Sequence, residues 1–351
     1  MKPEVSVIIP TYNCEDYIAQ ALESIFAQTY SNFEIILVDD ASTDSTLQIA
    51  RSFSDPRLKI IARPENTGVS SVRNCGISQA RGNWLALLDS DDWYAPKRLE
   101  NLLEIAIKQD ADLIADDLFL IRDREQYPWS TLLQKKQPRR GFVELIDAVR
   151  FVKSDRPSPI NAPRNWSLGY TKPLIKREFL LKHNLKYNEA INVGEDFILY
   201  LECLIKKARF LIVPQPYYYY RTRELSLSTR KPIQYLTQSC EITRTFIEEQ
   251  EADTKPDKKL LEAMYQNLKV FHKRLAYYSA IDCIKQKKFL KALIETIMRP
   301  YILIYFINKL ITILEIKTLA TSSIKEKDYV SLNSDNNSSD DLAPKQQFVG
   351  M

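Results

Sequence analysis

Three carboxylates stand within four residues at the end of an apolar segment, and their spacing is the first sign of chemistry in this sequence. Asp89, Asp91 and Asp92 follow the run Trp84–Leu88, whose composition is typical of a strand buried on both faces of a sheet. Carboxylates this close repel one another, so a compensating cation is expected beside them. Mg²⁺ or Mn²⁺ accepts such oxygen ligands and completes its shell with phosphate oxygens and water. The structural alternative is a solvated acidic turn that caps the next helix.

The elements that must position these carboxylates follow from the apolar pattern of the N-terminal part of the chain. Strand-like and helix-like segments alternate with short connections, which predicts a mostly parallel sheet with right-handed crossovers and helices on both faces. In such a sheet, ligands bind at the carboxyl ends of the strands. The predicted strands are Val5–Ile9, which Pro10 is expected to stop, Phe33–Val38, Leu58–Ala62 and Trp84–Leu88, and the predicted helices are Glu15–Phe26, Asp44–Phe53 and Val69–Ala80.

Polar residues follow every one of these strands, so they are expected to meet at one edge of the sheet. Tyr12 offers a flat face on which a base can stack, and Asp40 can accept the imide N–H of a uracil. Arg73, one turn into its helix, can reach a phosphate. The sequence contains neither GxGxxG nor GxxxxGK[ST], which argues against a dinucleotide-binding fingerprint and a P-loop. The clusters are Pro10, Tyr12 and Asn13 after the first strand, Asp39 and Asp40 after the second, Asn66 and Gly68 after the third, and the acidic group after the fourth.

Composition restricts the class of protein. The 351 residues carry 49 basic and 45 acidic side chains, and a net charge of +4 is too small to predict a nucleic-acid partner. Five widely spaced cysteines without a CxxC pair predict neither a disulfide framework nor a structural zinc site and are compatible with a reducing cytosol. The first residues lack the pattern of a signal peptide. We therefore expect a cytoplasmic protein.

Four motifs in order resemble the amino-terminal half of the family-2 glycosyltransferases: PTYN, VDDASTDST, NTGVSSVRNCG and LLDSDD. The resemblance covers roughly 5–117 and implies the GT-A fold, a nucleotide-diphosphate sugar donor, and inverting transfer. It also implies a divalent metal, Mg²⁺ or Mn²⁺, held at Asp89 and Asp91. With Asp40 placed to favour uracil, we expect a UDP-sugar. The expected nucleotide-sugar-binding residues are Pro10, Tyr12, Asn13, Asp40, Asn66, Gly68, Arg73 and Asp89.

The family also carries a catalytic carboxylate in a Glu-Asp pair that opens a helix, and this sequence has such a pair. Glu195 and Asp196 precede the helical pattern 197–207. Inverting transfer needs a base that takes the proton of the acceptor hydroxyl, and we assign this role to Asp196. Glu195 is expected to orient the base or the acceptor. The alternative is that the two side chains only favour the positive end of the helix dipole.

A basic residue is expected at the diphosphate leaving group. The run Tyr217–Tyr220 is followed by Arg221, with Arg223 close behind, and this segment resembles one that follows the base in many bacterial members. We expect Arg221 or Arg223 to contact the diphosphate. Alternatively, these tyrosines pack in a strand and the arginines have no such role.

The rest of the chain is expected to form an acceptor half and a helical extension. We predict a GT-A domain over 1–225, with a nucleotide-binding half 1–117 and an acceptor half 118–225, and a helix near 142–152. Helical patterns dominate 233–249 and 259–280, within an extension over 226–320, and the polar tail 321–351 is expected to be disordered.

An apolar run at 301–316 follows a group of lysines, and it is too short and too charged to span a membrane. It suits an interfacial helix over about 285–318 that makes peripheral contact with the cytoplasmic face of the membrane. Packing against the catalytic domain or a dimer partner is the alternative.

The sequence thus predicts an inverting, metal-dependent glycosyltransferase that acts on a glycan or lipid-linked acceptor in polysaccharide or cell-envelope synthesis. Two alternatives remain. A non-catalytic nucleotide-sugar binding module would keep the sheet without the chemistry. A sugar nucleotidyltransferase would usually carry a glycine-rich basic loop after its first strand, and PTYNCED is not such a loop.

Overall fold

The computed structural model describes residues 2–134, 143–156, 167–191, 193–222 and 232–307. These residues fall into two compact units. The first contains the sheet, its flanking helices and the following helices as far as Ser279, and the second begins at Ala280. Arg223, one of the two arginines expected at the diphosphate, lies outside the described residues. The polar tail 321–351 also lies outside them. The predicted domain boundaries stay a prediction.

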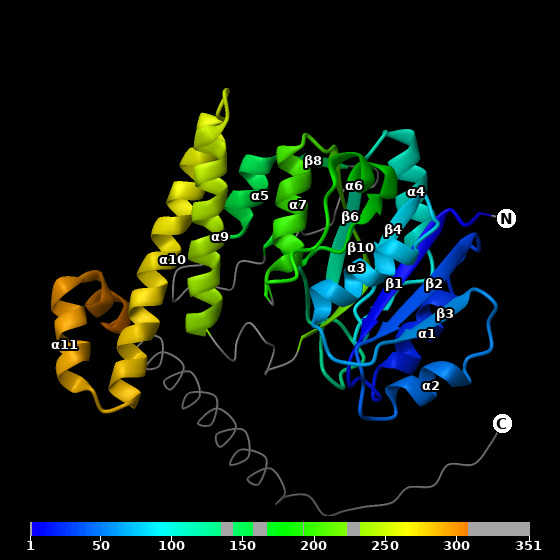
Figure 1. Ribbon diagram of the computed structural model, residues 1–351, viewed down its shortest axis with the longest axis horizontal. Helices are drawn as coiled ribbons and strands as arrows, with labels where there is room; N and C mark the ends of the chain where they lie inside the picture. The colour runs from blue at the N-terminus through cyan, green and yellow to red at the C-terminus, as the bar shows by residue number, and fades with distance from the viewer. Residues whose placement is uncertain (1, 135–142, 157–166, 192, 223–231, 308–351) are drawn as a thin grey trace, which may run out of the picture. The chain divides into compact units, whose positions relative to one another are not determined.

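The nucleotide-binding half has the predicted alternation of strands and helices (Figure 1). Strand β1 is the centre of this half, because it pairs in parallel with β2 on one side and with β4 on the other. Strand β3 extends the parallel arrangement beyond β2. The elements are β1 (Val5–Thr11), α1 (Ile18–Phe26), β2 (Phe33–Asp39), α2 (Thr46–Ser52), β3 (Leu58–Ala62), α3 (Val69–Gln79) and β4 (Trp84–Leu87).

A short antiparallel strand joins this half to the second one. Strand β9 (Leu174–Lys176) pairs with β4 on one side and with β6 (Leu113–Arg122) on the other, and β6 pairs in parallel with the long β10 (Phe210–Thr222). The resulting order is β3-β2-β1-β4-β9-β6-β10-β5. The other elements of this half are β5 (Trp93–Tyr94), α4 (Arg98–Lys108), β7 (Ser130–Thr131), β8 (Glu144–Ile146), α5 (Ala148–Ser154), η1 (Leu168–Tyr170), α6 (Arg177–His183) and α7 (Glu195–Ile205).

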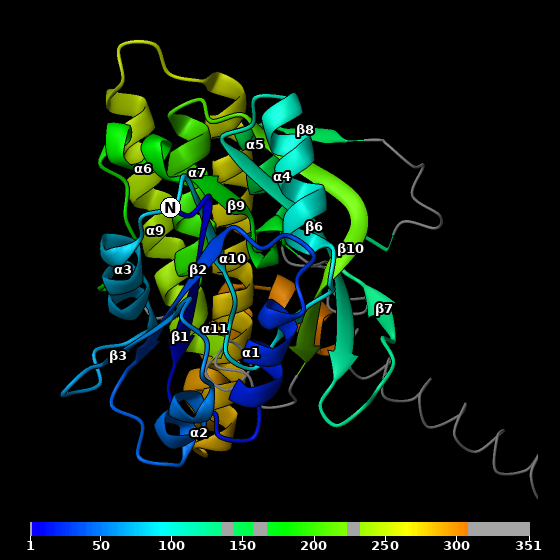
Figure 2. The ribbon, with the colours of Figure 1, turned by 90° about the vertical axis from the view of Figure 1, so that its right-hand side faces the viewer.

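Both faces of the sheet are covered, as the apolar strand segments predict (Figure 2). Side chains of β1 alternate between two apolar clusters, with Val7 in the cluster that includes α1 and α4, and Ile8 in the cluster that includes α5, α6 and α7. A strand buried on both faces needs apolar residues at successive positions, which explains the VSVII run. The mostly parallel GT-A-like α/β fold is confirmed.

Two local predictions were wrong. Strand β1 continues through Pro10 to Thr11 and pairs with β2. Its pairing with β4 ends at Ile8. Pro10 has no N–H to donate, and on the β4 side no hydrogen bond of the sheet is required from it. The helix predicted near 142–152 starts later, because residues 144–146 form β8 against β10. Asp147 then caps α5 by accepting a hydrogen bond from the Arg150 N–H at 2.7 Å.

Long helices follow the sheet, as predicted. Helices α9 (Pro232–Ala252) and α10 (Lys258–Lys285) pack on α5 and α7 through an apolar cluster that includes Phe246, Ile247 and Met264. Helix α11 (Phe289–Met298) belongs to the second unit. No helix within the described residues is long and apolar enough to cross a membrane.

A fully buried ion pair fixes the middle of the sheet. The side chains of Arg98 and Asp116 are 0% exposed, and their closest N···O distance is 2.7 Å. The same guanidinium donates a hydrogen bond to the backbone carbonyl of Lys172 and lies 4.3 Å from the ring centroid of Tyr94. A buried charge that loses its partner costs far more than an exposed one. Arg98 therefore ties α4 and β6 to the segment that leads into β9.

We expect Arg98→Met to lower the free energy of unfolding by about 3–5 kcal/mol, because it leaves Asp116 buried without its partner. Urea unfolding followed by circular dichroism measures the change. The matched control is Arg122→Met at the exposed pair Arg122–Glu125, where the loss should stay below about 1 kcal/mol. Equal losses in the two variants would contradict a structural role for the buried pair.

Candidate active site

A cavity of about 640 Å³ opens where the strands of the nucleotide-binding half end. Its lining combines residues from β1 and from the loops after β2, β3 and β4 with the first turn of α7. This is the edge at which an open α/β sheet binds ligands. Ten of the residues predicted from the sequence line it: Pro10, Tyr12, Asp40, Asn66, Gly68, Arg73, Asp89, Asp91, Glu195 and Asp196.

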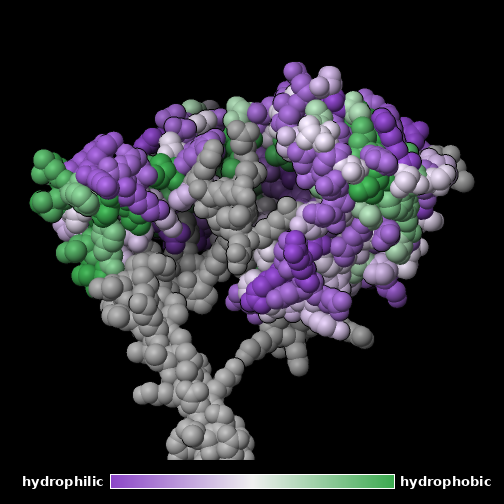
Figure 3. Space-filling view, turned by 90° about the horizontal axis from the view of Figure 1, so that it is seen from below, coloured by the Kyte–Doolittle hydropathy of each residue, from purple (hydrophilic) through white to green (hydrophobic). Residues whose placement is uncertain are grey.

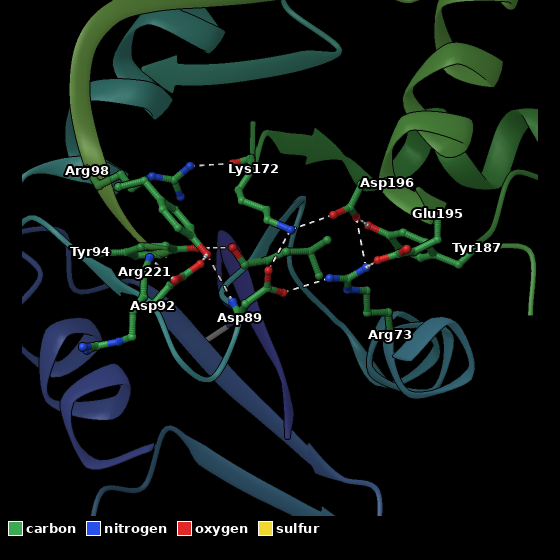
Figure 4. A network of polar contacts seen from close by, with 12 residues as sticks. Arg73, Asp89, Asp92, Tyr94, Arg98, Lys172, Tyr187, Glu195, Asp196 and Arg221 are labelled. Atoms are coloured by element: carbon green, nitrogen blue, oxygen red, sulfur yellow. Dashed lines mark hydrogen bonds and ion pairs between the residues drawn. The ribbon is translucent and has the colours of Figure 1, made fainter. Parts of the chain in front are cut away.

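Two buried cations join Asp89, in the loop after β4, to the two carboxylates that begin α7 (Figure 4). Lys172 Nζ lies 2.8 Å from Asp89 Oδ2 and 2.6 Å from Asp196 Oδ2. Arg73 places Nη2 2.8 Å from Asp89 Oδ1 and Nη1 3.1 Å from Asp196 Oδ1. Its Nη1 also lies 2.6 Å from Glu195 Oε1. Residues far apart in the sequence thus form one closed ring of charges.

The ring shifts the pKa values of its members in opposite directions. Burial opposes the charged form of Lys172, but the charges of Asp196 and Asp89 raise its pKa well above the usual value. Burial would raise the pKa of Asp89, yet Lys172 and Arg73 hold it well below its ordinary range. Burial, together with the charge of Asp196, raises the pKa of Glu195. Asp89 therefore stays ionised as the counter-charge of both cations.

Asp196 is held by three donors and keeps room for a fourth. Its Oδ1 accepts hydrogen bonds from Arg73 and, at 2.9 Å, from the Tyr187 hydroxyl, while its Oδ2 accepts one from Lys172. A carboxylate offers about four lone-pair sites, so Oδ2 can still accept a bond from a hydroxyl in the cavity. The residue is 7% exposed, and its side chain is fixed in orientation. This geometry suits a base that receives a proton from one direction.

Glycines in the left-handed region begin the two helices that carry the ring. Gly68 has φ +87° before α3, and Gly194 has φ +85° before α7. Such backbone angles are readily adopted only by glycine. These angles let the backbone turn sharply just before each helix, so that Arg73 lies one turn into α3 and Asp196 in the first turn of α7. NTG and GED are therefore turn signals as well as chemical motifs.

Asp40 lines the cavity, but its carboxylate already shapes a loop. Its oxygens accept hydrogen bonds from the backbone N–H of Thr67 and of Gly68, the latter at 2.9 Å, and from the Thr67 hydroxyl. The side chain of Asn66 donates to the carbonyl of Asp40. The two predicted nucleotide-binding loops thus hold each other in place. A contact of Asp40 with a base stays a prediction.

Asn13 and Arg221 are outside the cavity lining. Asn13 Oδ1 accepts a hydrogen bond from the Thr43 N–H at 2.8 Å, which joins the loops after β1 and β2. Arg221 donates to the carbonyl oxygen of Asp91 at 2.8 Å and to Gln20, and its guanidinium lies between the rings of Tyr17 and Trp93. Arg221 therefore holds the loop that carries Asp91 through this hydrogen bond. Its contact with a diphosphate stays a prediction.

Asp92, the last carboxylate of the acidic group, points away from the cavity. It accepts hydrogen bonds from the Tyr218 hydroxyl and the Arg221 N–H, both at 2.7 Å. Burial and the charges of Asp91 and Asp89 raise its pKa well above the usual value. Asp92 is therefore a structural anchor between the acidic loop and β10.

Lys172 and Tyr187 are the members of the site that sequence reasoning missed. The acidic cluster correctly indicated a need for positive charge, but a metal was the expected partner of the carboxylates, and Arg73 was expected at a phosphate. The protein supplies two cations of its own, one of them from a segment about 80 residues downstream, as the residue numbers show. A lone lysine in YTKPL gives no local signal of burial. Only the pairing of β9 brings it to the site.

Comparisons with known proteins agree with this geometry. Residues 6–162 match the family described as Glycosyl transferase family 2. The chain is 28% identical over 303 residues to the succinoglycan biosynthesis protein ExoO of Rhizobium meliloti (strain 1021), covering 86% of this chain and 83% of that protein. It spans less than two thirds of the length of some other curated relatives that it matches.

Solved structures share the fold. The structure of S. aureus TarS 1–349 in complex with UDP-GlcNAc has a TM-score of 0.59 at 22% identity, covering 83% of this chain and 78% of that one. The mannosyltransferase PcManGT from Pyrobaculum calidifontis, in complex with GDP-Man and Mn²⁺, has a TM-score of 0.52 at 18% identity, covering 88% of each chain. With the motifs and the cavity in their expected places, residues 6–162 of this chain are identified as a glycosyl transferase family 2 domain.

Proposed function

We propose that the protein transfers a sugar, with inversion, from a UDP-sugar to a hydroxyl of a glycan acceptor in the synthesis of a polysaccharide or another cell-envelope glycan. The observation that carries this proposal is the ring through which Lys172 and Arg73 join Asp89 to Asp196 in the cavity. A UDP-sugar is bound in the TarS structure, and ExoO is a succinoglycan biosynthesis protein. The donor and the class of acceptor are proposed by similarity to these two proteins.

In the proposed reaction, Asp196 takes the proton of the acceptor hydroxyl. The acceptor oxygen forms a bond to the anomeric carbon as the bond from that carbon to the nucleoside diphosphate breaks, and the electron pair leaves with the diphosphate. Arg73 and Tyr187 hold Oδ1 of Asp196 and Lys172 holds Oδ2, and the second lone pair of Oδ2 is the proposed acceptor of the hydroxyl proton. Glu195, held by Arg73, is placed to orient the acceptor.

The charge of the cavity favours a divalent ion as a partner of the donor. Two basic side chains line it, Arg73 and Lys172, and both are already paired with carboxylates. A diphosphate entering this acidic lining needs added positive charge. The acidic side chains of the described lining are Asp40, Asp89, Asp91, Asp155, Glu195 and Asp196.

The residues present fit an ion that shares its shell with the substrate. No group of three or more His, Cys, Asp or Glu side chains in the described parts of the chain is arranged to hold a metal. Mg²⁺ and Mn²⁺ sites with one or two carboxylates are completed by substrate phosphates. Asp91 would hold the ion, and Asp89, whose two oxygens face cations, is the weaker of the two predicted ligands. When bound, the ion supplies Lewis-acid stabilisation of the leaving diphosphate.

A lysine-rich apolar segment is proposed to make peripheral contact with an anionic membrane surface. The lysine-rich segment is defined here as residues 285–307, in which α11 exposes Leu290 by 72% and Met298 by 75%. Figure 3 shows apolar side chains gathered at the left of the view. The basic residues of the segment are Lys285, Lys287, Lys288, Lys291 and Arg299, against the single acidic residue Glu295. Exposed apolar area flanked by lysines is the composition of interfacial helices.

Asp196→Asn should lower the rate of nucleotide release in the presence of acceptor by roughly 100-fold or more, because general-base catalysis is worth about that much. A coupled assay for free UDP measures the rate, and a thermal-shift titration checks that donor binding is retained. Asn is nearly isosteric, so the fold should persist. Unchanged turnover in this variant would remove Asp196 from the mechanism.

Mn²⁺ should raise the melting temperature of the wild-type protein further in the presence of a UDP-sugar than in its absence, because the ion and the diphosphate are expected to bind together. Asp91→Asn should abolish this synergy. The matched control is Asp110→Asn, an exposed carboxylate outside the cavity lining, which should keep the synergy. Equal stabilisation by UDP-sugar with and without Mn²⁺ or Mg²⁺ would contradict metal dependence.

The double variant Leu290→Glu, Ile294→Glu should lose sedimentation with vesicles of phosphatidylglycerol and phosphatidylcholine, because it places charge on the apolar face of α11. Ile107→Glu, Leu181→Glu is the control, since both residues are large, apolar and exposed in the first unit. Donor hydrolysis should be unchanged in both double variants. The proposed contact would be contradicted if the wild-type protein did not sediment with anionic vesicles, or if the control variant lost sedimentation to the same extent.

A further inference from the structure

The end of the cavity beyond Asp196 is walled by helices from outside the predicted acceptor half. Residues of α9 and α10 line the same cavity as the carboxylate ring. We define the α9–α10 wall as Tyr235, Ser239, Ile242, Thr243 and Phe271. The same lining includes residues at the ends of β1, β2 and β4. Because α9 and α10 pack against α7, which carries Asp196 in its first turn, we assign the wall to the side of the proposed base.

The wall is a fixed part of the first unit. Phe271 is 2% exposed and packs in an apolar cluster with Leu236 and Cys240. A second apolar contact, later in α9 and nearer the start of α10, joins these two helices to α5 and to α7, the helix that carries Asp196. A surface held by buried apolar contacts on two sides is preorganised for a ligand.

The chemistry of this end suits a sugar ring. Phe197 and Tyr220 line it together with the aromatic residues of the wall, and aromatic faces give flat apolar area against which the C–H face of a pyranose can pack. The hydroxyls of Ser239 and Thr243 donate to backbone carbonyls of their own helix, at 2.9 and 2.6 Å. Their oxygens are thereby turned into acceptors for the hydroxyl groups of a ligand.

The charge of this end argues against an anionic ligand. Asp155 is the one ionisable acid or base that the described lining adds near the wall, and burial raises its pKa to about 7. A phosphate-bearing acceptor needs Arg or Lys donors. The two basic residues of the described lining, Arg73 and Lys172, already pair with Asp89 and Asp196. The hydroxyl groups of a neutral glycoside can donate hydrogen bonds to the hydroxyl and carboxyl oxygens of this end. Such a ligand brings no charge that would need a basic partner.

We propose that the α9–α10 wall is the acceptor subsite and that it binds an uncharged pyranoside, not a phosphate-bearing one. This inference rests on the proposed function, since it assigns the acceptor end of the same cavity. The helical extension thereby becomes part of the enzyme's specificity, and the donor loops remain independent of it.

The experiment uses the full-length protein with the UDP-sugar that it hydrolyses fastest. Transfer is measured to p-nitrophenyl β-D-glucopyranoside, the corresponding galactopyranoside, and the 6-phosphate of each. We expect kcat/KM for the neutral glycosides to exceed that for the 6-phosphates by about tenfold or more, because the phosphate loses its hydration without gaining a basic partner. Equal or better use of the 6-phosphates, or transfer to no neutral glycoside, would overturn the proposal.

The position of the subsite is tested by Ile242→Trp, which fills the cavity from the wall. We expect it to lower kcat/KM for the neutral glycoside by about tenfold or more while acceptor-independent hydrolysis of the donor changes less than about twofold. Thr245→Trp, on the exposed side of the same helix, is the matched control and should change neither. A higher KM for the donor with unchanged acceptor kinetics would overturn the assignment.

The two proposals fail in different ways. If the wild-type protein releases UDP from no UDP-sugar, the proposed function has failed and this inference fails with it. If the protein hydrolyses a UDP-sugar but Ile242→Trp leaves acceptor use unchanged, only the acceptor subsite is wrong. Folding of each variant is checked by its melting temperature with bound UDP.

Discussion

Charge compensation between buried side chains of the cavity is the constraint on which the rest of the structure depends. Asp89 and Asp196 belong to opposite halves of the domain, and neither is tolerated in a buried setting without a cation. Lys172 and Arg73 satisfy both carboxylates at once. The loop after β4 and the first turn of α7 are therefore held at a fixed separation before any substrate binds. Such preorganisation is the main means by which a protein site stabilises developing charge.

The sheet serves this constraint through its topology. Parallel strands bring the donor loops to one edge, and α3 contributes Arg73 from the same half. Lys172 belongs to the segment before β9, and Arg98 fixes its backbone carbonyl through a hydrogen bond. The buried Arg98–Asp116 pair is thus a support for the functional ring. Fold stability and site geometry share these residues.

Much of the fold could be predicted because its signals are local. Apolar runs such as VSVII and WLALL specify doubly buried strands, and four ordered motifs specify the family. The grouping of Tyr12, Asp89 and Asp196 in one cavity follows from the strand-end rule plus the resemblance. The ring itself could not be predicted, since the partner of Asp89 is set by tertiary pairing across the sheet. The contacts of Arg221 could not be predicted for the same reason, because its guanidinium packs against Tyr17 and Trp93, which are distant in the sequence.

Strand β9 has only three residues, yet it is the strand that joins β4 to β6. Short strands fray at a lower free energy than the core around them. Separation of this strand would carry Lys172 away and leave Asp89 and Asp196 with Arg73 as their shared counter-ion, one cation in place of two. Activity should therefore be lost on warming at a lower temperature than the spectroscopic signals of secondary structure. Bound nucleotide should reduce the difference between these two temperatures.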